Sequence, residues 1–196
     1  MTTAKPKTLR EEHFDLVWDI FTAVFPAKYG DEFMDAWMDR NRNLSYGMFG
    51  SDGNLHGFIL TTQTASHVSH TQKIEFLGVN PSCQKGGIGT QLLKLILDYC
   101  LRTNSRATLI PVNDPRIIHW YNKHGFVNYG QPFVSTYTGD IEQLMVFNHS
   151  ALAGPSLGNG SEEMAHHHRQ VPSLQQDTRT ELVSQVARES LRLLTA

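Results

Sequence analysis

The sequence predicts an α/β fold of the α+β kind, in which a central, mixed and mostly antiparallel sheet is flanked by helices. The first observation is the order of the helical and strand patterns, ααββ, βα, βα, ββ, which inserts two strand-to-helix units among strands that hairpins can join. The second is that the ten Phe, six Tyr and three Trp residues all lie at or before Phe147, so the core ends there. With 196 residues, the chain is expected to form one domain and a tail.

We expect the domain to cover residues 1–147 and to be followed by a linker and a terminal helix. Residues 148–176 are rich in Gly, Ser, Pro, His and Gln, which is typical of a flexible linker. In residues 177–196, Thr178 and Glu181 match a capping box. Apolar residues then recur at roughly helical spacing, at Leu182, Val186, Leu191 and Leu194. The pattern predicts an amphipathic helix, with a frayed tail as the alternative.

Two helices are expected to open the domain, over His13 to Val24 and Asp31 to Asp39. They are separated at Phe25-Pro26, because proline disfavours helix at the residue before it. Two strands follow, from Leu44 to Phe49 and from Leu55 to Thr62. The Asp-Gly pair in the turn between them is typical of a hairpin.

The rest of the domain alternates strand and helix and then closes with strands. A strand from Lys73 to Val79 precedes a glycine-rich loop. The helix after the loop places one apolar face toward the core: Ile88, Leu92, Leu95, Ile96 and Tyr99. The remaining predicted elements are a strand, a short helix and two closing strands: Ala107 to Val112, Pro115 to Lys123, Phe126 to Tyr129 and Gln143 to Phe147.

The charge pattern argues against nucleic acid as the main partner. The formal net charge is -2, and no run of Lys and Arg forms a basic stripe. The segment Met1 to Lys7 is polar and is followed by charged residues, so neither a signal peptide nor a membrane span is expected. We therefore expect a cytoplasmic protein, with the nucleus as the alternative, and no membrane partner.

No metal site is expected. The only two cysteines, Cys83 and Cys100, lack a zinc-ligand spacing and fit a reduced intracellular setting. Three adjacent histidines, His166 to His168, lie in the expected linker, where such a run is typical of polar filler.

The most informative stretch is Gln84-Lys85-Gly86-Gly87-Ile88-Gly89, because a strand precedes it and a helix follows. Closely spaced glycines remove the Cβ atoms that would keep a diphosphate from backbone N–H groups, and the helix end adds a positive dipole. A P-loop is disfavoured because Gly87 is not followed by Lys-Ser or Lys-Thr. A Rossmann loop is disfavoured because its third glycine position is Leu92. The loop therefore predicts a site for an anionic group.

Two motifs stand out along the chain. The first is Leu77-Gly78-Val79-Asn80-Pro81 followed by the glycine loop. The second is Asn113 with Tyr121-Asn122-Lys123-His124-Gly125-Phe126. Both motifs resemble those of the GNAT superfamily of N-acetyltransferases, and the resemblance extends over roughly residues 8 to 147. The resemblance implies the acyl-CoA N-acyltransferase fold, whose sheet is splayed at the acetyl-CoA site. It also implies an acyltransferase that moves an acetyl group from acetyl-CoA to a primary amine.

The resemblance places the donor, acetyl-CoA, along these motifs. Backbone N–H groups from Gln84 to Thr90 would bind its diphosphate, with Lys85 adding a positive charge. Leu77 and Val79 would offer backbone groups to the pantetheine arm. Asn113 would bond the same arm, cap the short helix, or do both. The residues expected to bind the donor are Leu77, Gly78, Val79, Gln84, Lys85, Gly86, Gly87, Ile88, Gly89, Thr90, Asn113 and Tyr121.

Tyr121 and Glu75 are the candidates for the two proton transfers. Tyr121 matches the general acid that is frequent in the family, since a neutral phenol can protonate the departing CoA thiolate. Its alternative is a tyrosine that only fills the core. Glu75 would accept the proton of the amine, and strand alternation is expected to place it on the same face as Leu77. A salt bridge between Glu75 and Lys73 is the alternative for that residue.

The acceptor is expected to be the amine of a small molecule or of a peptide. Phe25-Pro26-Ala27-Lys28-Tyr29 resembles the Phe-Pro-x-x-Tyr segment that lines the peptide groove of some N-terminal protein acetyltransferases. The bases of those enzymes would fall near Lys73 and Thr108, which cannot serve in the same way. An N-terminal protein acetyltransferase is therefore the narrower alternative, and a helix break with buried aromatic side chains explains the segment equally well.

An aromatic rather than acidic acceptor pocket is expected between the first two helices and the final strands. The residues expected to line it are Phe25, Tyr29, Phe33, Trp37, Phe133 and Tyr137. Acidic residues on the second helix would attract a cation, but acids on a helix generally face water. These are Asp31, Glu32, Asp35 and Asp39.

Two functions of other classes stay open at this point. A non-catalytic acyl-CoA-binding regulatory module would keep the glycine loop without turnover. An assembly subunit would use the apolar stripe from Leu182 to Leu194 to dock on a partner, for instance in a homodimer.

Overall fold

The computed structural model of this protein describes most of the expected domain: residues 4–40, 44–65, 70–135 and 139–147. The expected linker of residues 148–176 and the terminal helix of residues 177–196 lie outside these ranges, so both remain predictions.

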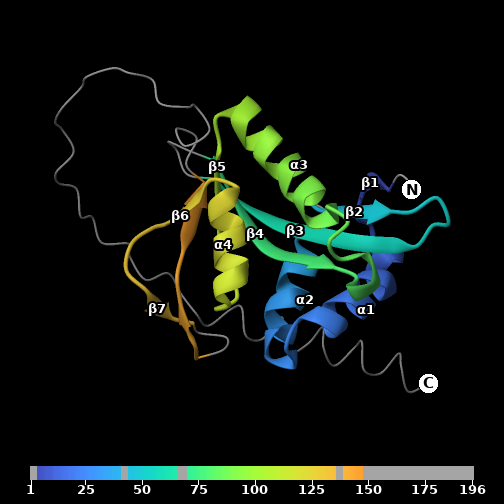
Figure 1. Ribbon diagram of the computed structural model, residues 1–196, viewed down its shortest axis with the longest axis horizontal. Helices are drawn as coiled ribbons and strands as arrows, with labels where there is room; N and C mark the ends of the chain where they lie inside the picture. Colours follow the sequence, from blue (N-terminus) through green and yellow to red (C-terminus); the bar gives the residue numbers. More distant parts are fainter. Residues whose placement is uncertain (1–3, 41–43, 66–69, 136–138, 148–196) are drawn as a thin grey trace. The chain divides into compact units, whose positions relative to one another are not determined.

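The described residues form a seven-stranded sheet and a separate two-stranded hairpin (Figure 1). The order in the sheet is β1 (Lys5–Thr8), β2 (Tyr46–Phe49), β3 (Leu55–Ala65), β4 (His70–Val79), β5 (Arg106–Leu109), β9 (Met145–Phe147) and β6 (Phe126–Asn128). Only β4 and β5 pair in parallel within this sheet. The hairpin joins β7 (Phe133–Val134) to β8 (Ile141–Glu142). The predicted fold class, a mixed and mostly antiparallel sheet, is confirmed.

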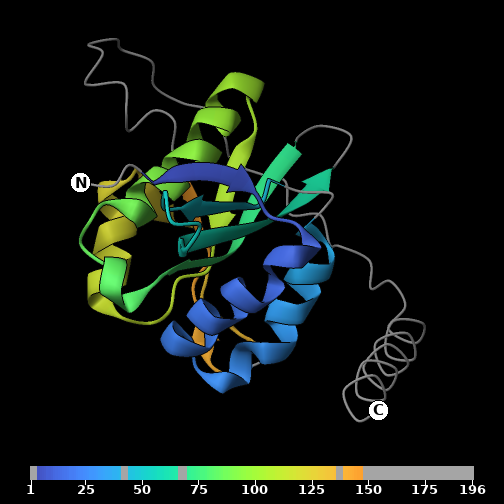
Figure 2. The ribbon, with the colours of Figure 1, turned by 90° about the vertical axis from the view of Figure 1, so that its right-hand side faces the viewer.

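Helices cover both faces of the sheet (Figures 1 and 2). They are α1 (Phe14–Val24), α2 (Gly30–Met38), α3 (Ile88–Thr103) and α4 (Pro115–Lys123). The face under α1 and α2 holds the α1–α2 cluster: Leu9, Val17, Ile20, Phe21, Phe33, Ala36, Trp37, Phe49, Leu55, Phe58, Leu60 and Phe76. The other face holds the α3 cluster: Met48, Ile59, Ile74, Ile88, Leu92, Leu93, Ile96, Leu97, Cys100, Ala107, Leu109, Tyr121, Phe126, Met145 and Phe147.

Aromatic rings fix the α1–α2 layer on the sheet. The rings of Phe21 and Phe33 lie 4.2 Å apart between centroids, and Phe76 of β4 meets both of them edge-on, at 5.5 and 5.7 Å. Such ring pairs contribute roughly 0.5–1.5 kcal/mol each beyond the area that they bury. Between the two helices the chain breaks as predicted: Phe25 is extended and Pro26 precedes a short 3-10 helix, η2 (Ala27–Tyr29). The ring contacts of this layer thus fix the position of the α1–α2 connection relative to β4.

A bulge in β4 changes which side chains face which layer. Leu60 of β3 pairs with Phe76 and Thr61 pairs with Ile74, so Glu75 is an extra residue. Ile74 therefore belongs to the α3 cluster, whereas Phe76, two positions on, belongs to the α1–α2 cluster. The expectation that Glu75 and Leu77 share a face is wrong, because it assumed an unbroken alternation across the bulge.

Strands β4 and β5 part halfway along β4. Their last paired residues are Ile74 and Leu109, and β4 continues to Val79 while β5 ends. The predicted strand from Ala107 to Val112 is thus too long at its end. From Glu75 to Val79, the edge of β4 that faces away from β3 pairs with no strand among the described residues, and we call it the open edge.

The sequence did not predict β1, β7 or β8, because none of these strands has a recognisable sequence pattern. Every residue of β1 is exposed, so it lacks the apolar alternation that indicates a strand. The β7–β8 hairpin consists of two-residue strands, which are too short for any period.

Candidate active site

The open edge of β4 presents backbone groups of alternate residues. The N–H of Asn80 donates to the carbonyl of His56 (2.9 Å), which makes this antiparallel position a hydrogen-bonded pair. Such pairs recur every second residue, so the backbone groups of Leu77 and Val79 point away from β3 and toward the open side. In agreement with this, Gln84 Nε2 lies 3.4 Å from the carbonyl oxygen of Val79. The edge can therefore pair with an extended ligand.

Gly78 lies between these two residues on the opposite face of β4. A Cβ at this position would lie 2.6 Å from a ring carbon of Phe58, so a larger residue would displace the ring. Gly78 is thus needed for packing under the edge.

The glycine loop forms the N-terminus of α3. Gly87 is the N-cap, with φ 79° and no side-chain cap, and Lys85 also has a positive φ of 64°. The first helical bond runs from Gln91 N to the carbonyl of Gly87 (3.0 Å). The N–H groups of the first turn, from Ile88 to Thr90, therefore have no acceptor within the helix. Since Gln84 to Gly87 are exposed, these donors and the helix dipole face a site that suits an anion.

The helix start lies directly on the open edge of β4. A Cβ on Gly89 would lie 3.5 Å from side-chain carbons of Leu77 and Val79, and 3.8 Å from Trp120 of α4. The anion site, the open edge and α4 are thus contiguous on the α3 side of the sheet.

Tyr121 follows Trp120 in α4 and is buried in the core. It is 8% exposed and packs in the α3 cluster, with its ring 5.6 Å from that of Phe126. Burial raises the pKa of the Tyr121 phenol above its ordinary value. The hydroxyl therefore keeps its proton at neutral pH, as a general acid requires.

Glu75 lies on the α1–α2 side of β4. Its Oε2 lies 2.6 Å from Lys73 Nζ, and Oε1 accepts a hydrogen bond from Thr62 Oγ1. The glutamate side chain is only 9% exposed. The salt bridge with Lys73 that the sequence left as an alternative is present, and together with Thr62 it gives this buried carboxylate polar partners.

Glu75 also lines a narrow cavity of about 40 Å³ where the two strands part. The cavity is lined by Phe25, Tyr29, Glu32, Glu75, Phe76, Ile110, Pro111, Val112 and Glu142. Three of these residues directly follow β5, two belong to β4, two belong to the break after α1, and one each comes from α2 and β8. The segment Ile110 to Val112 leaves the sheet here and forms one wall.

The cavity is acidic as well as aromatic, so the expectation of an aromatic rather than acidic pocket is corrected. Glu32 of α2 is half-buried and does not face water as expected, unlike Asp31, which is exposed. Burial raises the pKa of Glu32 above its ordinary value; Lys73 lowers it, while Glu75 and Glu142 raise it further. Burial also raises the pKa of the Tyr29 phenol. Carboxylates from three separate elements, α2, β4 and β8, thus line one cavity.

The other expected pocket residues lie elsewhere. Phe33 and Trp37 are buried in the α1–α2 cluster and do not line the cavity. Phe133 lies on β7 and is 41% exposed. Tyr137 lies outside the described residues.

Asp114, rather than Asn113, caps α4. Its Oδ1 accepts a hydrogen bond from the N–H of Arg116 (2.8 Å), because the N-cap directly precedes Pro115 at the first helical position. Asn113 lies one residue earlier and is exposed, beyond the end of β5. The capping alternative for Asn113 is therefore wrong, and its expected role toward the donor stays a prediction.

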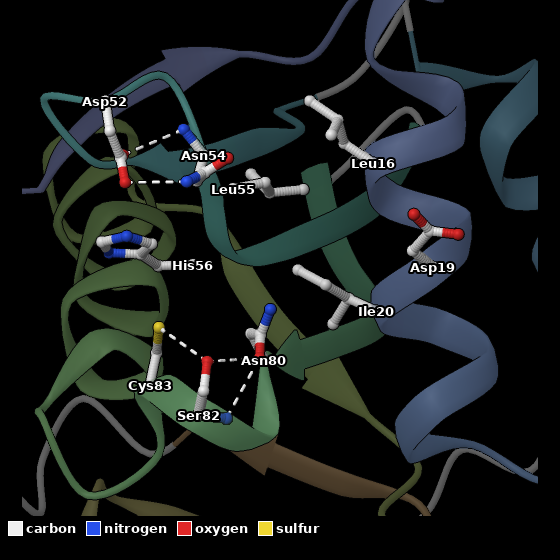
Figure 3. A pocket seen from close by; sticks show the side chains of 10 residues that line it. All are labelled: Leu16, Asp19, Ile20, Asp52, Asn54, Leu55, His56, Asn80, Ser82 and Cys83. Atoms are coloured by element: carbon white, nitrogen blue, oxygen red, sulfur yellow. Dashed lines mark hydrogen bonds between the residues drawn. The ribbon is translucent and has the colours of Figure 1, made fainter.

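A second cavity, of about 330 Å³, shares no residue with the first. It lies between α1 on one side and the β2–β3 turn with the η4 helix (Pro81–Cys83) on the other (Figure 3). Asp52 accepts two hydrogen bonds from Asn54, and Ser82 bonds Asn80 Oδ1 (2.8 Å). These polar groups close turns, and neither Glu75 nor Tyr121 lines this cavity, so we assign it no part in the site.

Neither a metal centre nor a membrane span is found in the part of the chain that the structure describes. Over these ranges, His, Cys, Asp and Glu side chains form no group of three or more that could hold a metal ion. Every helix in the same residues is too short or too polar to cross a bilayer.

Comparison with known proteins gives both a family and a fold. The model of the acetyltransferase (GNAT) family matches residues 10–126, more than half of the chain. No curated protein matches by sequence.

Several solved structures share the fold at low sequence identity. One is Arabidopsis thaliana Naa50 in complex with the bisubstrate analogue CoA-Ac-MVNAL, with 19% identity, coverage of 74% of this chain and 97% of that chain, and a TM-score of 0.63. Another is the ribosomal-protein-S18-alanine N-acetyltransferase from Escherichia coli (17%, 74% and 92%, TM-score 0.58). A third is a spermidine N-acetyltransferase SpeG chimera from Vibrio cholerae and hSSAT (16%, 79% and 100%, TM-score 0.59). With the glycine loop, the parted strands and the family match in agreement, this chain belongs to the GNAT family and is an N-acetyltransferase.

Proposed function

We propose that this enzyme transfers an acetyl group from acetyl-CoA to a primary amine, by direct attack of the amine on the thioester. One observation carries the proposal: β4 and β5 part at Ile74 and Leu109, with an anion site on one side of β4 and a cavity lined by Glu75 on the other. Such a gap allows a thioester on the α3 side to meet an amine on the α1–α2 side.

The residues on the α3 side fit the CoA part of the donor. The exposed loop from Gln84 to Gly87 and the free N–H groups up to Thr90 suit its diphosphate, and Lys85 adds a positive charge. The open backbone of Leu77 and Val79 suits the amides of the pantetheine arm. Asn113, exposed past the end of β5, is within the segment that would border the same arm. When bound, acetyl-CoA supplies the activated acyl group.

The two proton transfers then fall to Glu75 and Tyr121. An amine attacks only when neutral, so Glu75, which lines the cavity and pairs with Lys73, would take its proton. The new C–N bond forms as the C–S bond breaks, and the thiolate leaves with a proton from Tyr121. The buried phenol retains that proton at neutral pH, which supports this role.

Both acceptor classes, small molecules and peptides, occur among the structurally similar enzymes. The Naa50 structure carries a peptide-like analogue, and the SpeG chimera is named as a spermidine N-acetyltransferase. Phe25 and Tyr29, from the segment that resembles N-terminal protein acetyltransferases, line the acceptor cavity. N-terminal acetylation of proteins therefore remains the narrower variant of the proposal.

The purified full chain should release CoA thiol from acetyl-CoA when a mixture of amines and peptides is added. Thiol release would be followed with a chromogenic disulfide, and acetyl-CoA binding by calorimetry in parallel. Release above the amine-free background supports the proposal. Intact binding of acetyl-CoA without release from any acceptor would instead favour the non-catalytic acyl-CoA-binding module.

A further inference from the structure

The elements around β4 give the donor site a direction. The anion site lies at the start of α3, where a Cβ on Gly89 would lie 3.5 Å from side-chain carbons of Leu77 and Val79. The two strands join again at Ile74 and Leu109, further back along β4. A donor with its diphosphate at α3 and its arm along the open edge would therefore extend its acyl end toward this branch point.

Buried side chains close the branch point on the α3 side. Ile74, Leu109 and Met145 all belong to the α3 cluster and are at most 3% exposed. Because such a core is closely packed, an acyl chain cannot extend into it without displacing side chains. The acyl group finds space instead in the cavity on the α1–α2 side, which Glu75 lines.

This cavity is small compared with the groups that must meet in it. One water molecule needs roughly 10–15 Å³ of cavity volume, so about 40 Å³ corresponds to roughly three water-sized groups. The methyl of an acetyl group, the amine nitrogen and the first carbon of the acceptor are already three such groups. A longer acyl chain would therefore take the space of the attacking amine.

Two parts of the cavity wall resist widening. The ring of Phe25 lies 5.3 Å from those of both Phe21 and Phe76, stacked on the first and edge-on to the second. The segment from Ile110 to Val112 forms another part of the wall, and the ring of Pro111 restricts its backbone. A longer acyl chain would have to break ring contacts or shift this segment.

We infer that Phe25 and Val112, one from each of these two parts of the wall, limit the transferred group to acetyl. The inference rests on the proposed function. The chemical step is the same for every donor: the C–N bond forms, the C–S bond breaks, Glu75 takes the proton of the amine and Tyr121 protonates the thiolate.

Longer acyl-CoA molecules should still bind, because the donor side offers backbone groups to the CoA part that all of them share. In the absence of an acceptor, their acyl chain can occupy the space that the amine would need. They are therefore expected to compete with acetyl-CoA as inhibitors and to be poor substrates.

The test compares acetyl-, propionyl- and butyryl-CoA as donors for one acceptor that supports thiol release. In the parent protein, each added methylene should lower kcat/KM about tenfold or more, as expected for one extra methylene in an apolar pocket. Calorimetry should show binding of all three donors, and propionyl-CoA should inhibit turnover of acetyl-CoA competitively.

Two variants test the wall itself. Phe25→Ala and Val112→Ala should each raise the propionyl-to-acetyl ratio of kcat/KM at least about fivefold, because each removes part of the wall. Val112 is 37% exposed, so Val112→Ala should fold even if Phe25→Ala does not. The matched controls are Phe14→Ala in the α1–α2 layer and Val127→Ala on β6. Neither residue lines the cavity, and both variants should leave the ratio unchanged.

The outcomes separate the inference from the proposed function. The acyl-length inference is overturned, while the enzyme stands, by equal kcat/KM for the three donors or by failure of the longer acyl-CoA molecules to bind. An unchanged ratio in both Phe25→Ala and Val112→Ala overturns it as well. Absence of thiol release from acetyl-CoA with every acceptor overturns the proposed function itself. Because the readout is a ratio within each variant, partial loss of folded protein cancels.

Discussion

The two sides of β4 present different kinds of chemical group to the site. On the α3 side the site consists of backbone: the open edge at Leu77 and Val79 and the free N–H groups at the start of α3. On the α1–α2 side it consists of side chains, Glu32, Glu75 and Glu142, each from a different element. Backbone donors recognise a group common to all acyl-CoA molecules, whereas side chains can be exchanged one by one. Under the proposed function, the donor side is therefore the part common to the family, and the acceptor side is the part that selects the substrate.

The largest expected effect lies on the donor side, at Tyr121. If its hydroxyl protonates the thiolate, Tyr121→Phe should lower kcat roughly 10²–10⁴-fold, with acetyl-CoA affinity unchanged. Steady-state kinetics and calorimetry would measure the two quantities. Tyr46→Phe is the matched control, because Tyr46 also packs against the α3 cluster. Undiminished turnover in Tyr121→Phe would show that the tyrosine only fills the core and is not the general acid.

Glu75 is expected to have the next largest effect, because it is the base that we propose for the acceptor side. Glu75→Gln should lower kcat/KM about 10²-fold. Lys73→Met removes the same ion pair but keeps the carboxylate, so it should retain most of the activity. Rates for both variants at several pH values would check this. Equal losses in the two variants would mean that only the ion pair matters.

Gly87 tests whether the donor side depends on the backbone of the loop. Gly87→Ala forces a Cβ onto a residue with φ 79° and should raise the acetyl-CoA Kd about tenfold, since one misplaced charged contact costs roughly 1.4 kcal/mol. Gly53→Ala meets the same strain, at φ 81° in the β2–β3 turn and with nothing within 4 Å. Both variants should lose about 1 kcal/mol of stability. Equal acetyl-CoA affinity of the two would contradict a role for the loop.

The smallest expected effect concerns the stability of the acceptor side. The pKa of Glu32 is raised by burial, so its neutral form is favoured by folding, and its contribution to stability is lost as pH rises through that pKa. Glu32→Gln should therefore raise the free energy of unfolding at neutral pH by about 0.5 kcal/mol. The gain should disappear under acid conditions that protonate Glu32 in the parent protein. Urea melts across this pH range would show it, and Asp31→Asn should show no such gain.

The contrast between the two sides also explains what the sequence could predict. The glycine loop and the strand before it are local in sequence, so their pattern predicted an anion site. Their resemblance to a known family, together with the motif from Asn113 to Phe126, predicted the GNAT family, and the family is confirmed. Glu32 and Glu142 lie far apart in sequence and meet only in the fold, and neither has a distinctive neighbour pattern. The face of Glu75 could not be predicted either, because a bulge has no reliable sequence signal. The end of β5 at Leu109 could not be predicted either, because the segment Ile110 to Val112 that follows is as apolar as the strand itself.

The bulge at Glu75 also has a consequence for how the enzyme can change over time. One extra residue makes β4 present Ile74 to one layer and Phe76 to the other. The alternation of side chains between the two faces therefore reverses at the bulge. Deleting one residue anywhere between the start of β4 and the bulge would restore regular alternation along the strand. Glu75 would then point away from the acceptor side. The length of β4 is therefore under stricter constraint than its composition. Substitutions at the acceptor side do not change the length of β4. Substrate specificity can therefore change while the donor site keeps its structure.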